Sequence, residues 1–260
     1  MSLSLRFLGV GSAHAVQLGS AAGVIEQAGA PLLMIDCGDD ALTAYLDTYG
    51  EAPRAVYLTH AHMDHIGGLE RLFYSSYFDL ALRGNIRLYA HAALIPILQA
   101  RVADYPQVLA EGGANFWDAF SVVPCSRGFW HRGFWFDVFP TRHHAPMTSF
   151  GLSLRGSLVW TGDTRPIPEM LGQFASNDEL VAHDCGLVGN PSHTGADDLD
   201  REYPAELRNR LILYHYASAD DGQALRERGY RVASRGEEIV LADALPEVVL
   251  DRGVLAALGI

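Results

Sequence analysis

Short apolar runs, separated by glycine, proline and polar clusters, divide the first part of the chain into strands and helices. Residues 3–8 alternate apolar and polar side chains, which is the period of a half-buried strand. Strands are predicted over residues 3–8, 22–27, 32–35, 54–58 and 86–90. Helices are predicted over residues 39–49, 69–78 and 92–104. After Arg54, residues 55–58 are apolar, which is typical of a strand that is buried on both faces.

The pattern continues to the end of the chain without a proline- or serine-rich linker. Further strands are predicted over residues 134–140, 151–154, 157–160, 180–185 and 211–216, and a helix over residues 220–228. We therefore expect residues 1–260 to form a single domain.

Aromatic residues are concentrated between residues 112 and 139. The tripeptides Gly128-Phe129-Trp130 and Gly133-Phe134-Trp135 repeat after five residues, which predicts a β-hairpin. We favour a hairpin that faces the core. The alternative is a pocket wall or a contact between the subunits of a homodimer, because aromatic side chains dominate such surfaces.

Composition narrows the class of protein. The 260 residues are 49% hydrophobic, which is ample for a large core. The net charge of −12 argues against an extensive nucleic-acid or membrane surface. Three scattered cysteines predict no disulfide framework and a reducing compartment. No signal peptide or membrane-spanning run is evident, so we expect a cytoplasmic enzyme.

The stretch from Thr59 to Gly68, Thr-His-Ala-His-Met-Asp-His-Ile-Gly-Gly, carries the clearest chemistry. His60 and His62 alternate, so on an extended backbone both rings leave the same face. Asp64 and His65 are adjacent, so a turn must follow to direct them differently. The stretch lies between a predicted strand and a predicted helix, where open α/β folds place their sites. Four ligand-type side chains at this spacing indicate a metal site.

This stretch resembles the HxHxDH signature of the metallo-β-lactamase-fold hydrolases, extended by Thr59 to THxHxDH. The resemblance implies an α/β fold of αββα type, in which two mixed β-sheets are flanked by helices. It implies that His60 and His62 bind one metal with a third histidine, and that Asp64 and His65 bind a second. A further aspartate bridges both ions.

Later motifs follow in the order that this family has. The third histidine is expected at the end of the 134–140 strand, where His143 and the adjacent His144 compete; we prefer His143, and His144 stays open as ligand or donor. Thr161-Gly162-Asp163-Thr164 resembles the turn whose aspartate bridges the metals. His215, at the end of the last predicted strand of the site, corresponds to the remaining ligand of the second metal.

Other residues resemble the phosphodiesterase-like, tRNase Z-related branch of the superfamily. They are the glycine-rich turn at residues 9–14, the TGDT turn at residues 161–164 and His193-Thr194. The resemblance implies that His193 helps to protonate the leaving group; the alternative is that Thr194 or Ser192 caps a helix near residues 196–202. His14 is expected to face either the site or solvent.

Five more residues have two alternative roles. The resemblance implies that Asp36 orients the metal loop without binding metal; the alternative is that it caps the 39–49 helix, and the two roles are compatible. His183 and Asp184 match the branch in part, as a pair beside the site or as a simple strand end. Arg142 and Arg165 could meet a phosphate or carry surface charge.

These residues predict a dinuclear metal-dependent hydrolase with Asp64 and His193 as candidate catalytic residues. Imidazole and carboxylate donors without a thiolate suit two divalent ions, Zn²⁺ first, with Mn²⁺ or iron as alternatives. A metal-bridging hydroxide would attack a phosphodiester. A small or cyclic-nucleotide substrate is favoured over structured tRNA, because the chain is acidic and no basic clasping arm is evident. The alternatives are a carboxylic ester, thioester or lactone hydrolase of the glyoxalase II or lactonase type, and a metal-stabilised binding protein.

Overall fold

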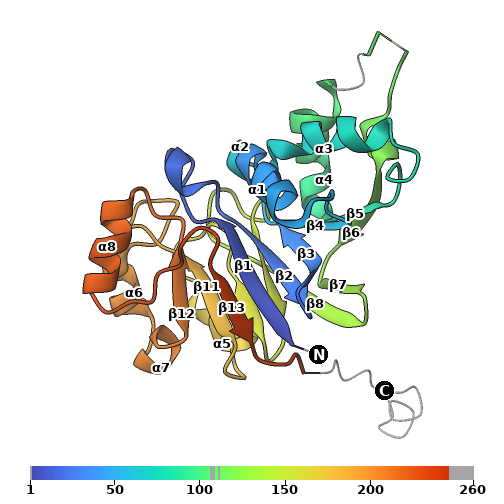
Figure 1. Cartoon of the computed structure of the whole chain (residues 1–260). Coiled ribbons are helices and arrows are strands. Elements are labelled where there is room, and N and C mark those ends of the chain that lie inside the picture. The colour runs from blue at the N-terminus through green and yellow to red at the C-terminus, as the bar shows by residue number, and fades with distance from the viewer. Residues whose placement is uncertain (1, 106–108, 111, 246–260) are drawn as a thin grey trace, which may run out of the picture.

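Two mixed β-sheets face each other, and helices cover their outer surfaces (Figure 1). The structure is a computed structural model that describes residues 2–105, 109–110 and 112–245. The predicted αββα arrangement is therefore observed. The expected single domain also includes residues 246–260, which lie outside the described residues.

The first sheet has seven strands and combines an antiparallel with a parallel half. Strands β13, β1, β2 and β3 pair antiparallel, whereas β3, β4, β5 and β6 pair parallel. In spatial order the strands are β13 (Glu238–Leu241), β1 (Leu3–Gly9), β2 (Ala22–Gln27), β3 (Ala30–Ile35), β4 (Ala55–Leu58), β5 (Ile86–His91) and β6 (Phe120–Cys125). All four residues of β4 are buried, as its apolar sequence predicted.

The second sheet has six strands. Strands β12, β11 and β10 run parallel, and β10, β9, β8 and β7 pair antiparallel. In spatial order they are β12 (Leu211–Tyr214), β11 (Leu180–Asp184), β10 (Leu158–Trp160), β9 (Phe150–Leu154), β8 (Phe134–Pro140) and β7 (Gly128–His131).

The α-helices form two groups, one beside each sheet (Figure 1). The first group contains α1 (Asp39–Tyr49), α2 (Met63–Ile66), α3 (Gly68–Tyr77) and α4 (Ile95–Leu98). The second contains α5 (Pro168–Phe174), α6 (Ala196–Glu202), α7 (Ala205–Arg208) and α8 (Ala219–Glu227). Within the described ranges, none of these helices is long and apolar enough to cross a bilayer.

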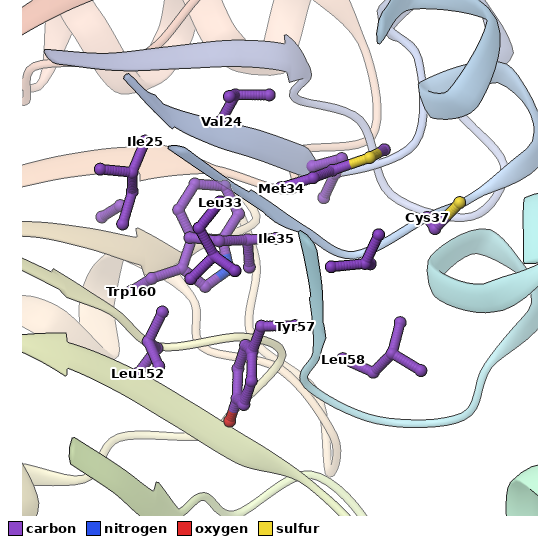
Figure 2. Packing of buried hydrophobic residues seen from close by; sticks show 14 of the residues in the cluster. Val24, Ile25, Leu33, Met34, Ile35, Cys37, Tyr57, Leu58, Leu152 and Trp160 are labelled. Atoms are coloured by element: carbon purple, nitrogen blue, oxygen red, sulfur yellow. The ribbon is translucent and has the colours of Figure 1, made fainter. Parts of the chain in front are cut away.

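Aromatic and aliphatic side chains fill the space between the sheets. Trp160 of the second sheet packs on Phe7 of β1, with ring centroids 5.7 Å apart, and on Tyr214 of β12 at 4.4 Å. Figure 2 shows Trp160 beside Leu33, and Tyr57 pointing its hydroxyl toward the second sheet. That hydroxyl donates to the Gly151 carbonyl at 3.1 Å, so it is buried without losing a partner. This packing fixes the position of one sheet against the other.

Several segments differ from the sequence prediction. The predicted 92–104 helix is a succession of a 3-10 turn (Ala92–Leu94), the α-helical turn α4 and a π-helical turn (Gln99–Ala103). Pro96 in the middle of this stretch lacks an N–H donor, which disfavours a regular helix. Strand β6 and the helices α5 and α7 were not predicted.

The aromatic hairpin is confirmed as β7 and β8, which pair from Gly128 opposite Asp137 to His131 opposite Phe134. Phe129 and Phe136 are buried, whereas Trp130 is 49% exposed. The hairpin therefore faces the core with one side, as we favoured, and leaves a tryptophan on the surface.

Candidate metal centre

The loop after β4 delivers four candidate ligands in two directions. His60 and His62 follow the strand in extended conformation, and His62 immediately precedes α2. The single turn of α2 then carries Asp64 and His65 away from them. This is the change of direction that two adjacent ligands require.

A first set of donor atoms surrounds one point beside β4. The Nδ1 atom of His62 lies 3.1 Å from the Nε2 atom of His60 and 3.1 Å from the Nε2 atom of His143. The Oδ2 atom of Asp163 is 3.6 Å from His60 Nε2 and 3.8 Å from His143 Nε2. Donors bound tetrahedrally to one ion at about 2.1 Å would be about 3.4 Å apart, so the spacing fits a divalent metal.

A second set shares Asp163 with the first. The Oδ2 atom of Asp163 lies 3.2 Å from His215 Nε2 and 3.4 Å from His65 Nε2. The Oδ2 atom of Asp64 lies 3.4 Å from His65 Nε2 and 4.0 Å from His215 Nε2. Asp163 follows Gly162, whose positive φ of 63° allows the turn to pass close to Thr59. Asp163 is thus placed between the two sets.

Several donor atoms in these sets have no other partner. Among the described residues, His65 Nε2, His215 Nε2 and Asp163 Oδ1 are buried without a hydrogen bond. Unpaired buried polar atoms are costly, and bound cations would satisfy them. The donor set, imidazole and carboxylate without thiolate, fits a divalent metal.

Burial and neighbouring charges shift the pKa values of the candidate histidine ligands. Burial holds the pKa of His60 well below its ordinary value and lowers that of His143 to about 4. Burial also opposes the charge of His215, but Asp163 and Asp184 outweigh it and raise its pKa to about 10. His60 and His143 are thus already in the neutral form that binds metal, whereas His215 must release a proton.

The Asp36 carboxylate fixes the loop that follows β4 through hydrogen bonds from Thr59 and His65. Its Oδ2 atom accepts from His65 Nδ1 at 2.8 Å, and its Oδ1 atom accepts from the Thr59 amide at 2.8 Å. The Thr59 hydroxyl also donates to this carboxylate at 2.8 Å. The orienting arrangement expected for Asp36 is present, whereas the alternative of a helix cap is wrong, because the N-terminal cap of α1 is Gly38.

Asp184 plays the corresponding part in the second sheet. Its Oδ2 atom accepts from His193 Nδ1 at 2.8 Å and from the Thr164 amide at 2.8 Å. Its Oδ1 atom lies 3.3 Å from His215 Nδ1. One buried carboxylate therefore orients both a candidate ligand and a candidate acid.

The idea that His183 pairs with Asp184 beside the site is wrong. The His183 ring contacts the Tyr203 hydroxyl at 2.8 Å on the other side of β11. Neighbours in a strand point to opposite faces, so only Asp184 reaches the site. In the sequence, the feature that points to Asp184 is its place as an acidic residue at the end of a predicted strand.

His193 lies across both ligand sets. Its ring stacks on His215 with centroids 4.8 Å apart, and its edge meets His143 at 4.7 Å. The helix-cap alternative for this segment is wrong: α6 is capped at Gly195, and the Thr194 hydroxyl donates to the Thr164 carbonyl at 2.7 Å. With Nδ1 donated to Asp184, the Nε2 atom is the one left for the cavity.

The ligand sets open into a cavity of about 460 Å³. Asp64, Asp163, His193 and His215 line it, together with His14, so His14 faces the site. Leu187, Val188 and Asp221 also line it and were not singled out from the sequence.

Three sequence candidates lie away from this cavity. Arg142 pairs with Glu169 at 2.7 Å, and the Arg165 Nε atom donates to the Arg142 carbonyl at 3.1 Å. Neither arginine lines the cavity, so a direct contact with bound phosphate is not what this structure shows. His144 is exposed and packs its ring against His62 without joining the donor atoms of either set.

Comparison with known proteins agrees with this architecture. A family model described as "Anti-Pycsar protein Apyc1" matches residues 3–239. A protein of that name from Saccharibacillus brassicae is 30% identical over 226 residues, covering 83% of this chain and 90% of the relative.

Solved structures share the fold at lower identity. A diphosphatase of the PhnP family has a TM-score of 0.72 at 18% identity, covering 94% of this chain and 99% of its own. The metallo-β-lactamase-fold protein YhfI from Bacillus subtilis has a TM-score of 0.70 at 15% identity, covering 92% and 100%. The predicted metallo-β-lactamase fold and the prediction of a metal-dependent hydrolase are confirmed, and the chain belongs to the Anti-Pycsar protein Apyc1 family.

Proposed function

We propose that this phosphodiesterase-type hydrolase acts on small phosphodiesters, with cyclic nucleotides as the favoured class, through two divalent ions. The observation that supports this proposal is that the His193 ring packs against one histidine of each ligand set, in the cavity onto which the two sets open. The first ion would be held by His60, His62 and His143. The second would be held by Asp64, His65 and His215, with Asp163 between them.

Two divalent ions bound there would supply positive charge for the phosphoryl oxygens and would lower the pKa of a nearby water molecule. Zn²⁺ suits the donors best, and Mn²⁺ or iron also fit. Asp64 lines the cavity as well as contributing to the second set, so it also helps to position the attacking water.

His193 is the residue we assign to the leaving group. Its Nδ1–H donates to Asp184, which fixes the ring and presents Nε2 to the cavity. As the phosphorus–oxygen bond breaks, protonated His193 donates its Nε2 proton to the departing oxygen. The Asp184 carboxylate stabilises the charged imidazole before this transfer, and its hydrogen bond to Nδ1 keeps the ring aligned.

The cavity supports a small substrate. Its volume of about 460 Å³ lies within the range of small-molecule sites, about 300–1,000 Å³. Among the described residues that line it there is no arginine, so the two ions would meet the phosphate charge. An extended nucleic acid would need a basic surface along its backbone. Leu187 and the 80% exposed Val188 offer an apolar wall for a nucleobase.

The test compares metal-loaded wild type with His193→Ala on three substrate types: a cyclic mononucleotide, bis-p-nitrophenyl phosphate, and a thioester with a lactone. Wild type should hydrolyse both phosphodiesters faster than the carboxylic esters. His193→Ala should slow the cyclic nucleotide about 10²- to 10⁴-fold. It should slow bis-p-nitrophenyl phosphate much less, because p-nitrophenolate leaves without protonation.

His14→Ala is the matched control, since His14 lines the same cavity and makes no contact with Asp184. Metal content should be equal in all three proteins. Absence of phosphodiesterase activity with either Zn²⁺ or Mn²⁺ would refute the proposal. Faster turnover of the thioester or lactone, unaffected by His193→Ala, would favour the glyoxalase II or lactonase alternative.

A further inference from the structure

A second polar cavity lies at the other end of the strand that leads to the metal centre. It measures about 340 Å³ and is lined by Arg54, Asn85, Arg87, His131 and Arg132; we call it the arginine cavity. Arg54 immediately precedes β4, whose last residue Leu58 is followed two positions later by His60. Four strand residues span about 13 Å, so the two cavities are separate sites.

Three positive charges gather there without a negative partner. Among the residues that the structure describes, Arg54, Arg87 and Arg132 make no ion pair with a carboxylate, although the chain has 31 acidic and 19 basic residues. Other arginines, such as Arg6 and Arg142, do pair. Like charges in one cavity repel each other, and a bound anion would remove that cost.

The backbone below these arginines is fixed. The Arg87 amide donates to the Arg54 carbonyl at 3.0 Å, which ties the two positions together. His131 contacts the Leu32 carbonyl through Nε2 at 3.0 Å and the Tyr89 hydroxyl through Nδ1 at 2.9 Å. The tip of the β7–β8 hairpin is thereby anchored to β3 and β5. His131 thus uses both ring nitrogens for structure. Arg87 Nη1 donates to the Tyr89 hydroxyl at 3.4 Å and Asn85 Nδ2 donates to the Ala81 carbonyl at 3.1 Å, so the other N–H groups of the guanidinium groups and the second N–H of the Asn85 amide remain as donors.

Arg132 occupies an unusual backbone position. Arg132 and Gly133 form the two-residue loop between β7 and β8, with φ of 46° and 85°. Two positive φ values describe a type I′ turn, which asparagine followed by glycine fits best. An arginine in this left-handed conformation costs free energy. The turn therefore carries a side chain that backbone preference alone would not select.

We propose that the arginine cavity binds a phosphoryl anion, either inorganic phosphate or the phosphate group of a nucleoside monophosphate. Guanidinium groups offer paired N–H donors that match the oxygens of phosphate, and three of them with one amide can surround it. This inference depends on the arginines and not on the metal ligands, so it stands apart from the proposed catalytic function.

The test measures binding of inorganic phosphate and, separately, of a nucleoside monophosphate to the metal-loaded protein by titration calorimetry at low salt. Wild type should bind one phosphoryl group in addition to any held at the metal centre. Arg87→Gln and Arg132→Asn should each weaken this additional site about tenfold or more, because each removes charged hydrogen bonds. Retention of one anion over the other identifies the source of the phosphate.

Two controls separate binding from folding. Arg155→Gln removes an exposed arginine whose side chain makes no hydrogen bond or ion pair with the described residues, so it makes the same change in net charge and should leave both sites intact. Arg132→Asn suits the type I′ turn, so its melting temperature should equal or exceed that of wild type while binding falls. If Arg87→Gln and Arg132→Asn bind phosphate as Arg155→Gln does, the proposal is wrong.

Discussion

The two sheets contribute to the metal centre in different ways. The seven-stranded sheet supplies its four candidate ligands from one loop, between β4 and α3. The six-stranded sheet supplies its residues from separate strand ends and loops, after β8, β10 and β12 and beyond β11. The first contribution is local in sequence, whereas the second exists only when β8, β10, β11 and β12 are side by side.

Both sheets nevertheless orient their candidate ligands in the same way. Each places one buried carboxylate behind the ligands: Asp36 behind His65, and Asp184 behind His215. Asp36 and His215 each stand where the chain leaves a strand and turns into the site. Both have a positive φ, 62° and 69°, which strains the backbone of a residue other than glycine. The difference is that Asp184 also holds His193, so the second sheet joins metal binding to proton transfer.

Asp163 is the point where the two contributions meet, and its removal should have the largest effect. Asp163→Asn replaces a carboxylate that faces His60, His65, His143 and His215 by a neutral amide. The loss of several kcal/mol of charge stabilisation predicts a fall in kcat/KM of about 10³-fold or more. Metal content and phosphodiester hydrolysis measure this directly. The exposed Asp178→Asn is the matched control, and unchanged metal content in Asp163→Asn would contradict its bridging role.

Replacing the two supporting carboxylates by asparagine, one at a time, sharpens the comparison between the sheets. Asp36→Asn should weaken metal binding about 10- to 100-fold, because His65 loses the partner that orients it. Asp184→Asn should weaken metal binding similarly and should also slow poor leaving groups more than good ones, because His193 is released.

The measurements are metal affinity and the ratio of kcat on a cyclic mononucleotide to kcat on bis-p-nitrophenyl phosphate, at saturating metal. The ratio should fall in Asp184→Asn and stay at the wild-type value in Asp36→Asn. Equal ratios in both variants would mean that the two carboxylates do the same work, and that His193 does not depend on Asp184.

The same contrast explains what could be predicted from the sequence. The motif from His60 to His65 is contiguous, and its flanking strand and helix have clear periodicity, so its position in the fold was predictable. Whether its residues bind metal stays a prediction. His143 could be placed nearer the site than His144 only by the resemblance, and the structure brings His143 to the other donors.

The other parts of the two sites depend on how the strands pack side by side, which the hydrophobic periodicity of the sequence does not reveal. Residues His183 and Asp184 are adjacent, and only the position of β11 between β10 and β12 decides which of them faces the site. The arginine cavity draws Arg54, Arg87 and Arg132 from the starts of two strands and a distant hairpin. No local pattern in the chain connects those three positions.

A buried carboxylate away from the metal centre should show the smallest effect and the clearest pH dependence. Glu26 on β2 is 1% exposed and accepts from Arg6 Nε at 2.8 Å, Ser4 Oγ at 2.8 Å and Tyr49 OH at 2.5 Å. Burial opposes its ionisation, but these hydrogen bonds outweigh burial and lower its pKa from the ordinary value of 4.5.

Glu26→Gln should therefore lower the free energy of unfolding by about 1.5–3 kcal/mol at neutral pH, the range for hydrogen bonds to a charged group. A pKa lowered by folding adds stability that is complete above pH 4.5 and is lost as the pH falls through the folded value. The difference between wild type and Glu26→Gln should consequently shrink below pH 4.5. Urea unfolding with a chelator present, at neutral and acidic pH, measures that difference, with the exposed Glu51→Gln as control. A difference that stays constant with pH would show that Glu26 stabilises the sheet through its shape and not its charge, in contrast to Asp36 and Asp184, whose charge faces histidines.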